Sequence, residues 1–459
     1  MTMRDDNGWT LHRLSLRNFR NFPALDINFS PKITLLVGRN GSGKTSVLDA
    51  LAIMLRVPLR NLSGKRDNEL SAEPLQFVDG DAHLKVTSLD SNRKTAHIEA
   101  QYPVDASLEA DIDGHLLRWN RARATMQNRT TYAAHEVEDV VRDLQQRAIG
   151  PFPEGRCAPG KEATLPVIAY YGVERLVKNR RDQGKIQSSR LDAYLSALDH
   201  GSDLTRLRGF IRDLDEAVVR ADRFGDEDPE AAIQQFSAID TACSSVLKPA
   251  GWSQLRWNGT VRDLTLRNRE NLRLPLSQLA SGPRIIAGLA IDLASRMARA
   301  NPHLGAKDLL ENTPGIVLID EVDLHLHPEW QQKIVPQLTQ TFPRVQFVMT
   351  THSPQVISTV EANNIRIMSA DDVQVARYSE GLRSDVVLEE VQDVDPVPQA
   401  TNTRRLLAEY LEQVYAGKGT MPQTAKMRDV LDKRGGAELY EELREADVYM
   451  KFERWEVPR

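Results

Sequence analysis

The residues from Gly38 to Thr45, Gly-Arg-Asn-Gly-Ser-Gly-Lys-Thr, fit the pattern of a phosphate-binding loop. The glycines let backbone N–H groups turn toward phosphate oxygens, and the helix that follows adds the positive end of its dipole. Lys44 would place a positive charge beside the β- and γ-phosphates, and the Thr45 hydroxyl would be a ligand of Mg²⁺. A chance glycine turn before a helix is the alternative. The nucleotide-binding residues that we expect are Gly38, Asn40, Gly41, Ser42, Gly43, Lys44, Thr45 and Ser46.

Two adjacent acids, Asp320 and Glu321, follow the apolar segment Gly315–Ile319. At the end of a buried strand their side chains point in different directions. Asp320 could therefore hold a hydrated Mg²⁺, while Glu321 polarises the attacking water as a general base. A helix cap is the alternative for such a pair, but the phosphate-binding loop upstream favours the catalytic interpretation.

His352 directly follows a third apolar segment, Gln346–Thr350, and its neighbour Thr351. A single histidine after a strand is usually structural. Here the strand order would bring the imidazole to the γ-phosphate, where it could donate a hydrogen bond to phosphate or to the attacking water. We expect His352 to act with Glu321 in catalysis.

Ser281 and Gly282 stand at the start of a helix predicted over about 282–301. The hydroxyl of Ser281 and the first backbone amides of this helix would form an anion-binding site. An ordinary N-cap serine in a loop is the alternative, and the two residues alone do not distinguish these interpretations.

The segments around these motifs alternate between strand and helix patterns. Ile33–Val37 is a continuous apolar run, as in a strand buried on both faces, and an amphipathic helix follows the loop. The other predicted elements are short strands within 11–29, an antiparallel meander over 80–123, a helix at 135–148, a strand at 166–171, helices over 176–250, strand-like residues at 254–274, and helices in the last 90 or so residues.

The composition is that of a globular protein, with 41% hydrophobic and 27% charged residues in 459. Two cysteines, Cys157 and Cys243, exclude a disulfide framework. There is neither a signal sequence nor an apolar run of about 18 residues, so we expect a cytoplasmic protein without membrane contact. With 59 basic and 64 acidic residues, any contact with nucleic acid must come from a local patch.

The order of the motifs resembles that of an ABC-type ATPase head of the RecF/SMC kind. Leu14–Arg20, Leu-Ser-Leu-Arg-Asn-Phe-Arg, is similar to the N-terminal strand of such heads. Asp320–Trp330, Asp-Glu-Val-Asp-Leu-His-Leu-His-Pro-Glu-Trp, resembles the bacterial subgroup that includes OLD-type ATPases and the PtuA-type ATPase of Septu antiphage systems. The resemblance covers residues 11–56 and 276–356 well, and the rest of the chain weakly.

The resemblance implies an α/β fold, an ABC-type P-loop ATPase head with an antiparallel β subdomain, an inserted helical arm and a helical C-terminal extension. The corresponding parts would be an N-terminal ATPase lobe at 1–123, a lid and helical insertion at 124–275, a C-terminal ATPase lobe at 276–370, and a helical extension with a potential partner-binding region at 371–459.

Heads of this kind pair head-to-tail around two ATP molecules. The resemblance therefore implies ATP and Mg²⁺ as cofactors and a homodimer or higher homo-oligomer, in which Ser281 of one subunit closes the site that holds Lys44 of the other. Pro283 departs from the usual acidic or amide residue after Ser-Gly. No clear Mg²⁺-sensing glutamine is present, and Glu174 stands near its expected place, so turnover could be slow.

Several residues allow a second interpretation. His325 and His327 could bind a metal, but no third ligand is close in sequence, which favours a loop role. The basic clusters at 118–123 and 178–190 could contact DNA or form a solvated face. We expect no intrinsic nuclease, since too few residues follow Met368 for a nuclease domain. Aromatic residues near the chain end, from Tyr440 to Trp455, could dock a partner or pack on their own domain.

Together these features predict the ATPase subunit of an antiphage defence system such as Septu, which regulates a separately encoded HNH-type nuclease. A RecF-like DNA repair ATPase, with DNA contact through the helical arm, is the alternative in the same class. In a different class, the protein would be a mainly non-catalytic scaffold that ATP holds together and that sequesters an effector.

Overall fold

The computed structural model describes most of the chain. The described residues are 8–65, 67–71, 76–90, 95–149, 163–173, 189–199, 204–224, 230–369, 372–395 and 401–456. Their contacts divide the chain into two compact units, Met1–Gln392 and Asp393–Arg459, and each unit is described here by itself. In this part of the chain, no helix is both long enough and apolar enough to cross a bilayer.

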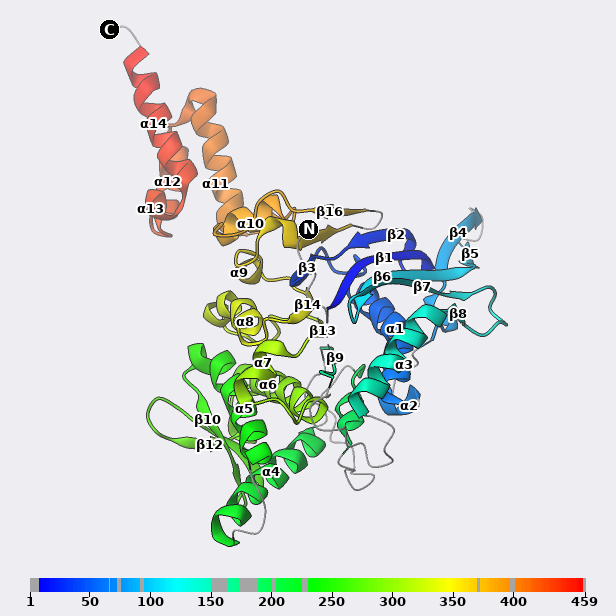
Figure 1. The fold of residues 1–459 in the computed structure, drawn as a ribbon. Helices are drawn as coiled ribbons and strands as arrows, with labels where there is room; N and C mark the ends of the chain where they lie inside the picture. The colour runs from blue at the N-terminus through cyan, green and yellow to red at the C-terminus, as the bar shows by residue number, and fades with distance from the viewer. Residues whose placement is uncertain are drawn as a thin grey trace, which may run out of the picture. The chain divides into compact units, whose positions relative to one another are not determined.

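A six-stranded sheet forms the centre of the first unit (Figure 1). Its strands are β3 (Ile33–Val37), β9 (Val167–Tyr171), β13 (Gly315–Ile319), β14 (Val345–Thr350), β15 (Ile365–Met368) and β16 (Val373–Val375). They lie in the order β16–β15–β3–β14–β13–β9, and all neighbours are parallel except β15 and β16. The apolar runs of β3, β9, β13 and β14 are fully buried, as the sequence predicts.

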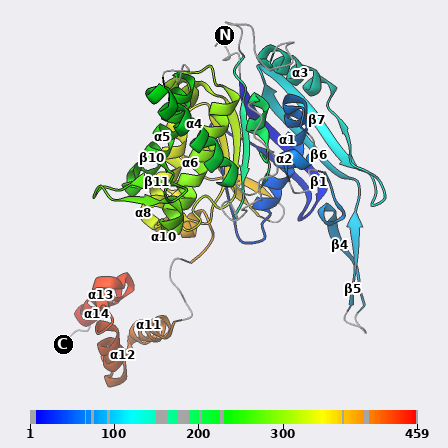
Figure 2. The same cartoon turned by 90° about the horizontal axis from the view of Figure 1, so that it is seen from below.

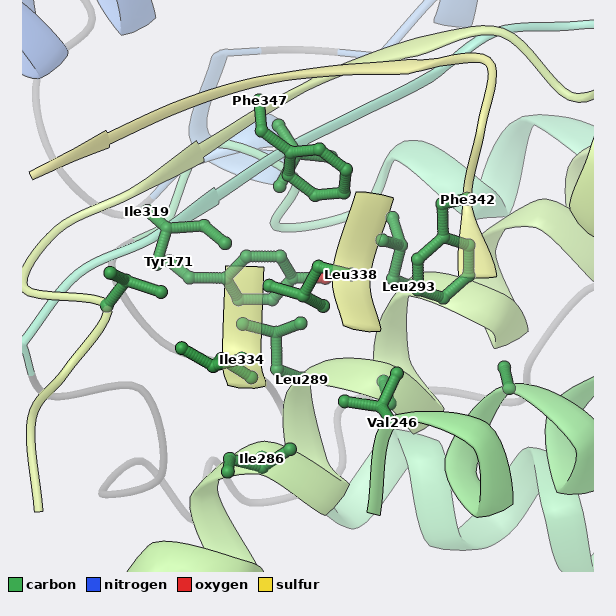
Figure 3. Packing of buried hydrophobic residues seen from close by; sticks show 14 of the residues in the cluster. Tyr171, Val246, Ile286, Leu289, Leu293, Ile319, Ile334, Leu338, Phe342 and Phe347 are labelled. Carbon is green, nitrogen blue, oxygen red and sulfur yellow. The ribbon is translucent and has the colours of Figure 1, made fainter. Parts of the chain in front are cut away.

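The sheet separates two hydrophobic cores. Along β13, Val317 and Ile319 belong to one buried cluster, whereas Ile316 and Leu318 belong to the other, because successive side chains of a strand point to opposite faces. Figure 3 shows the first cluster, in which strand residues meet helix residues. The labelled side chains there include Tyr171, Ile319, Phe347, Leu289, Leu293 and Ile334.

Helices cover both faces of the sheet (Figures 1 and 2). The helices whose residues join the first cluster are α4 (Leu204–Phe224), α5 (Glu230–Leu247), α6 (Ser281–Ala300), α7 (Ala306–Asn312), α8 (Pro328–Thr341), α9 (Pro354–Ile357) and α10 (Ser384–Glu390). Those that contribute to the second are α1 (Lys44–Ser63), α2 (Asp67–Leu70) and α3 (His135–Ile149). The segment predicted as an inserted arm is helical, and its helices α4 and α5 contribute to the same core as α6.

An antiparallel sheet packs on the second core. Its strands are β1 (Trp9–Phe19), β2 (Phe22–Asn28), β6 (Val104–Ile112), β7 (His115–Arg123) and β8 (Thr131–Ala133), in the order β2–β1–β6–β7–β8. The predicted meander over 80–123 is wrong in one respect, because β4 (His83–Asp90) and β5 (Thr95–Gln101) form a separate hairpin. The apolar residues of that hairpin, Leu84, Val86 and Ile98, stay exposed, so no buried face joins it to the sheet.

A second antiparallel sheet of three strands lies beside α5. It consists of β10 (Ser253–Asn258), β11 (Asp263–Arg267) and β12 (Arg273–Pro275), in that order. The strand-like pattern at 254–274 predicts these strands. A short 3-10 turn, Leu276–Gln278, connects β12 to the start of α6.

The second unit is a small helical domain. Its helices are α11 (Asn402–Gln413), α12 (Pro422–Asp432), α13 (Gly436–Leu439) and α14 (Glu441–Glu456), and they enclose a core of their own. The predicted helical extension began at residue 371, but β16 and α10 belong to the first unit. A three-residue strand such as β16 gives too short an apolar pattern to be recognised from sequence.

Candidate functional site

The three predicted motifs meet because β3, β14 and β13 are parallel neighbours in the sheet. The carboxyl ends of parallel strands lie at one edge, so the loops that follow them come together there. These loops line a cleft with about 530 Å³ of empty space. The lining residues are Asn21, Asn40, Gly41, Gly43, Lys44, Thr45, Ser46, Asp320, Glu321, Thr350 and His352.

The phosphate-binding loop has the backbone that its glycines predict. Gly41 and Gly43 have φ values of 82° and 89°, a conformation that favours glycine. The Lys44 ammonium donates to the carbonyl oxygens of Gly38 and Arg39, at 2.8 and 3.1 Å. Its pKa is lowered, chiefly by burial, although the nearby carboxylates of Asp320 and Glu321 oppose this effect. The lysine is thus held at the loop, where an anion would relieve its desolvation.

The turn between β1 and β2 braces this loop from outside. The side-chain amide of Asn21 donates to the carbonyl of Gly41 at 2.7 Å. The Phe22 ring lies so close to Gly43 that a Cβ there would sit 2.2 Å from a ring carbon. The Gly43 position therefore requires glycine for space as well as for its backbone angle. Sequence analysis missed Asn21, because nothing in its local pattern links it to residues 20 positions away.

Asp320 is the point where the loops are joined by hydrogen bonds. The Thr45 hydroxyl donates to one oxygen of Asp320 at 3.0 Å, and the Thr350 hydroxyl donates to the other at 2.6 Å. Asp320 is only 3% exposed. The backbone N–H of Glu321 donates to Thr350 at 2.7 Å, which fixes the start of the turn that follows the strand. Thr350 is a second residue that sequence analysis did not single out.

The oxygens of Thr45 and Asp320 fit a magnesium ion. Both are hard oxygen ligands, they lie 3.0 Å apart, and they face the same cleft as Lys44. Mg²⁺ in nucleotide sites is bound by few protein oxygens of this kind, with phosphate and water completing its octahedron. Glu321 lines the cleft beside them and has a φ of 48°, so it leaves the strand direction immediately after Asp320. The two acids therefore take different paths, as predicted.

His352 also lines the cleft, and its pKa is lowered. Burial has the largest effect, the positive charge of Lys44 adds to it, and Asp323, Glu321 and Asp320 act in the opposite direction. The imidazole is therefore neutral near pH 7 and keeps one N–H donor and one acceptor. Its backbone carbonyl accepts from the Gln392 side chain at 2.9 Å, which helps to hold the segment after β14.

Ser281 and Gly282 do not line this cleft. Ser281 is the first residue of α6 and is exposed, whereas Ala280 is the N-cap, so the predicted capping role of the serine is wrong. Gly282 faces the loop after Asp320, and a Cβ there would lie 2.9 Å from the His325 carbonyl oxygen. Pro283 lies in the first turn, where its missing N–H costs no helical hydrogen bond. The roles of both residues stay predictions.

The alternatives that the sequence left open divide into two groups. His327 is the N-cap of α8, and its side chain accepts from the backbone of Glu329, which supports the loop interpretation. The described residues hold no group of three or more metal-binding side chains. Tyr440 packs against the core of the helical domain, which supports the packing interpretation for that residue. Glu174, Cys157 and the basic residues 178–185, and the side chains of Phe452 and Trp455, lie outside the described residues.

The basic cluster at 118–123 is largely structural. Trp119 and Arg121 are each 1% exposed on β7. They donate to the backbone carbonyls of Met54 and Ile53 in α1, at 3.1 and 2.6 Å. Arg123 is engaged by Asp79 and by the carbonyl of Phe77. This cluster therefore ties the antiparallel sheet to the helix that follows the phosphate-binding loop.

The family model described as "AAA domain, putative AbiEii toxin, Type IV TA system" matches residues 33–358. The Retron Ec83 probable ATPase of Escherichia coli is 26% identical over 482 aligned positions, which cover 92% of this chain and 83% of that protein. The Septu protein PtuA of Bacillus mycoides is 33% identical over 109, covering 24% of this chain and 14% of its own. The SmcHead structure in complex with the C-winged helix domain of ScpA has a TM-score of 0.46 and 16% identity, over 80% of this chain and 97% of its own.

These matches confirm the resemblance to ABC-type ATPases near the PtuA type. The retron ATPase, which matches over nearly the whole chain, was not foreseen from the sequence. The family model covers well over half of the chain and both halves of the cleft. The chain belongs to this AAA-domain family.

Proposed function

We propose that this member of the AAA-domain family is a Mg²⁺-dependent ATPase that works as the regulatory subunit of an antiphage defence system. The observation that carries the proposal is the convergence on Asp320. Residues from three segments, Thr45, Asp320 and Thr350, are joined by hydrogen bonds of 3.0 and 2.6 Å beside Lys44 and Glu321. Such an arrangement fits a magnesium-bound triphosphate.

Each side chain then has a defined task. Lys44 and the amides of the glycine-rich loop hold the phosphates, and Thr45 and Asp320 hold Mg²⁺, which neutralises the charge that develops on the transferred phosphate. Glu321 accepts the proton of the attacking water. The neutral imidazole of His352 donates a hydrogen bond to the γ-phosphate or to that water.

Ser281 would act on the site of a second copy. Its exposure at the N-terminus of α6, and its absence from the cleft of its own chain, support a head-to-tail dimer in which it closes the partner's site. The first amides of a 20-residue helix supply an anion-binding end for the γ-phosphate.

The defence role rests on the relatives. A retron ATPase matches across most of the chain, and a Septu protein matches over a shorter stretch. By analogy with Septu, the effector would be a separately encoded nuclease of the HNH type, which assembles with this chain and is controlled by its nucleotide state. Co-expression of the neighbouring open reading frame with the tagged chain tests this assembly by co-purification.

The variant Glu321→Gln tests the ATPase directly. It should bind ATP with the affinity of the wild type but hydrolyse it about 10²- to 10⁴-fold more slowly, because the proton acceptor is lost and the shape is kept. Glu329→Gln is the matched control, since Glu329 is an exposed acid on α8 whose side chain contacts Lys333. If wild-type protein binds ATP and Mg²⁺ without any turnover, the chain is the ATP-held scaffold instead.

A further inference from the structure

The three-stranded sheet β10–β12 has two unlike faces. Leu255, Leu264 and Leu266 point into the first core. The register pairs Arg267 with Arg273 directly, and Arg256 with Thr265, two residues from Arg267. Because side chains alternate along a strand, the three arginines share the face away from the core. We call Arg256, Arg267 and Arg273 the arginine face.

Carboxylates do not neutralise the centre of this face. Arg267 donates to the side chain of Gln254 at 3.2 Å, and Arg273 donates to the Gln254 carbonyl at 2.8 Å and to Thr265. Within the described part of the chain, no carboxylate lies within ion-pair distance of either guanidinium.

The acids nearby are engaged elsewhere. Asp263 pairs with Arg208 of α4 at 2.8 Å and accepts from the backbone of Ser277. Asp240 of α5 accepts from the backbone of Leu255 and lies 3.6 Å from Arg256 alone. Arg267 and Arg273 therefore stand side by side as like charges.

The proximity of these charges has a measurable cost. The pKa of Arg273 is lowered, first by burial and then by the positive charges of Arg256 and Arg267, and Asp240 offsets this only weakly. A bound anion would remove both the repulsion and the unmet hydrogen-bonding capacity of the two guanidinium groups.

The charge of the surrounding segment points the same way. Residues 251–275 contain five arginines, at positions 256, 262, 267, 269 and 273, against two acids, Asp263 and Glu270, whereas the whole chain has a net charge of −5. The two further arginines, Arg262 and Arg269, are exposed in the loops on either side of β11. The face is thus a local basic patch on an acidic protein, the only kind of feature that could attract a polyanion here.

We propose that the arginine face binds the phosphate backbone of a nucleic acid. Guanidinium groups on neighbouring strands and at alternate positions are about 5 to 7 Å apart, so they present a row of donors to a regular line of charges. A nucleic acid supplies such a line, with one charge per about 1.7 Å of duplex. The planar fork of arginine matches phosphate oxygens bidentately, and the segment 251–275 contains no lysine.

The position of the face links it to the cleft. The strand β12 ends at Pro275, only six residues before Ser281, and Asp263 of β11 holds Ser277 in the intervening turn at 3.0 Å. A nucleic acid on the face would therefore stiffen the start of α6. This link to turnover rests on the proposed function, whereas binding itself does not.

Fluorescence anisotropy of the full chain with labelled DNA, without nucleotide, tests the proposal. A 30-nucleotide single strand and the corresponding duplex are the probes, and poly-glutamate of similar charge is the competitor. The double variant Arg267→Gln/Arg273→Gln should weaken DNA binding at least about tenfold at 0.1 M salt, and reduce the slope of log affinity against log salt by about two. Arg142→Gln/Arg383→Gln, which neutralises two exposed arginines elsewhere, should leave binding unchanged.

The single variant Arg267→Glu guards against misfolding, because its side chain contacts only the exposed Gln254, and its melting temperature should match the wild type while DNA affinity falls. Three outcomes would overturn the proposal. These are absence of DNA binding by the wild type, equal loss in the control double variant, and displacement of DNA by poly-glutamate at equal charge, which would assign the face to an acidic protein. Loss of ATP turnover in Glu321→Gln with normal DNA binding leaves the two proposals separate.

Discussion

The nucleotide cleft and the arginine face are built in opposite ways. The cleft is assembled from short contiguous motifs, each at the end of a strand, so the chemistry of Lys44 and Asp320 is visible in the sequence before the strands are placed. The arginine face has no motif, because Arg256, Arg267 and Arg273 become neighbours only through the register of three strands. A basic cluster along the sequence and a basic surface on the protein are therefore different things.

The largest effect that sharpens this comparison is expected at Arg121. This residue belongs to the contiguous basic cluster, yet it is buried and donates to the Ile53 carbonyl at 2.6 Å. Arg121→Ala should lower the free energy of unfolding by about 3 kcal/mol, because it leaves a buried acceptor and a cavity. Thermal or urea unfolding measures this loss.

DNA affinity of the folded Arg121→Ala protein should remain that of the wild type. A selective loss of DNA binding with unchanged stability would instead return the nucleic-acid surface to the cluster at 118–123 and break the comparison.

The next effect concerns Ser281, which connects the two regions. Ser281→Ala should keep ATP binding but slow hydrolysis about 10- to 100-fold, since one donor to the γ-phosphate is lost. Mixing Ser281→Ala with Glu321→Gln protein tests the assignment in trans. Mixed dimers contain one site that holds both changes and one site that holds neither. Activity above that of either variant alone supports a shared site, and no gain on mixing argues for a site within one chain.

A smaller effect is expected with pH. Burial and Lys44 lower the pKa of His352, so the neutral imidazole persists as pH falls from 8 toward the ordinary histidine value of about 6.5. ATP turnover at saturating substrate should stay level over this range and decline only below it, as the imidazole takes up a proton. The matched variant His352→Gln should be slower at all pH values, by less than Glu321→Gln, and should lack that decline.

The smallest effect is predicted for Gly282. An alanine in a helix usually stabilises relative to glycine, but a Cβ here would meet the His325 carbonyl oxygen at 2.9 Å. Gly282→Ala should therefore lower stability by about 1 kcal/mol and disturb the contact between α6 and the loop after Asp320. Gly80→Ala is the control, because a Cβ there meets nothing within 4 Å. Equal stability changes at both positions would show that the contact has no energetic weight.

Much of the fold follows from sequence because its signals are local. The fully apolar runs of β3, β13 and β14 mark strands buried on both faces, and the loops that follow them had to meet at one edge of the sheet. The hairpin turn at Asp113–Gly114 was equally visible, and both residues have positive φ.

The parts that escaped prediction depend on contacts between distant residues. Asn21 reaches Gly41 through a hydrogen bond that only the packing of β1 and β2 against α1 creates. Thr350 looked like the last residue of a strand, although its hydroxyl joins Asp320 to Glu321. The capping role given to Ser281 was wrong by one position, because helix boundaries are set by hydrogen bonds that composition does not reveal. The division of the chain into four parts stays a prediction.

The helical domain at Asp393–Arg459 encloses its own buried residues, among them Tyr410 and Leu443. A segment with a private core has little need of the rest of the polypeptide to keep its shape. Evolution can therefore exchange or remodel this tail without disturbing the machinery for nucleotide chemistry, and one engine can be fitted to different effectors by changing its last 67 residues.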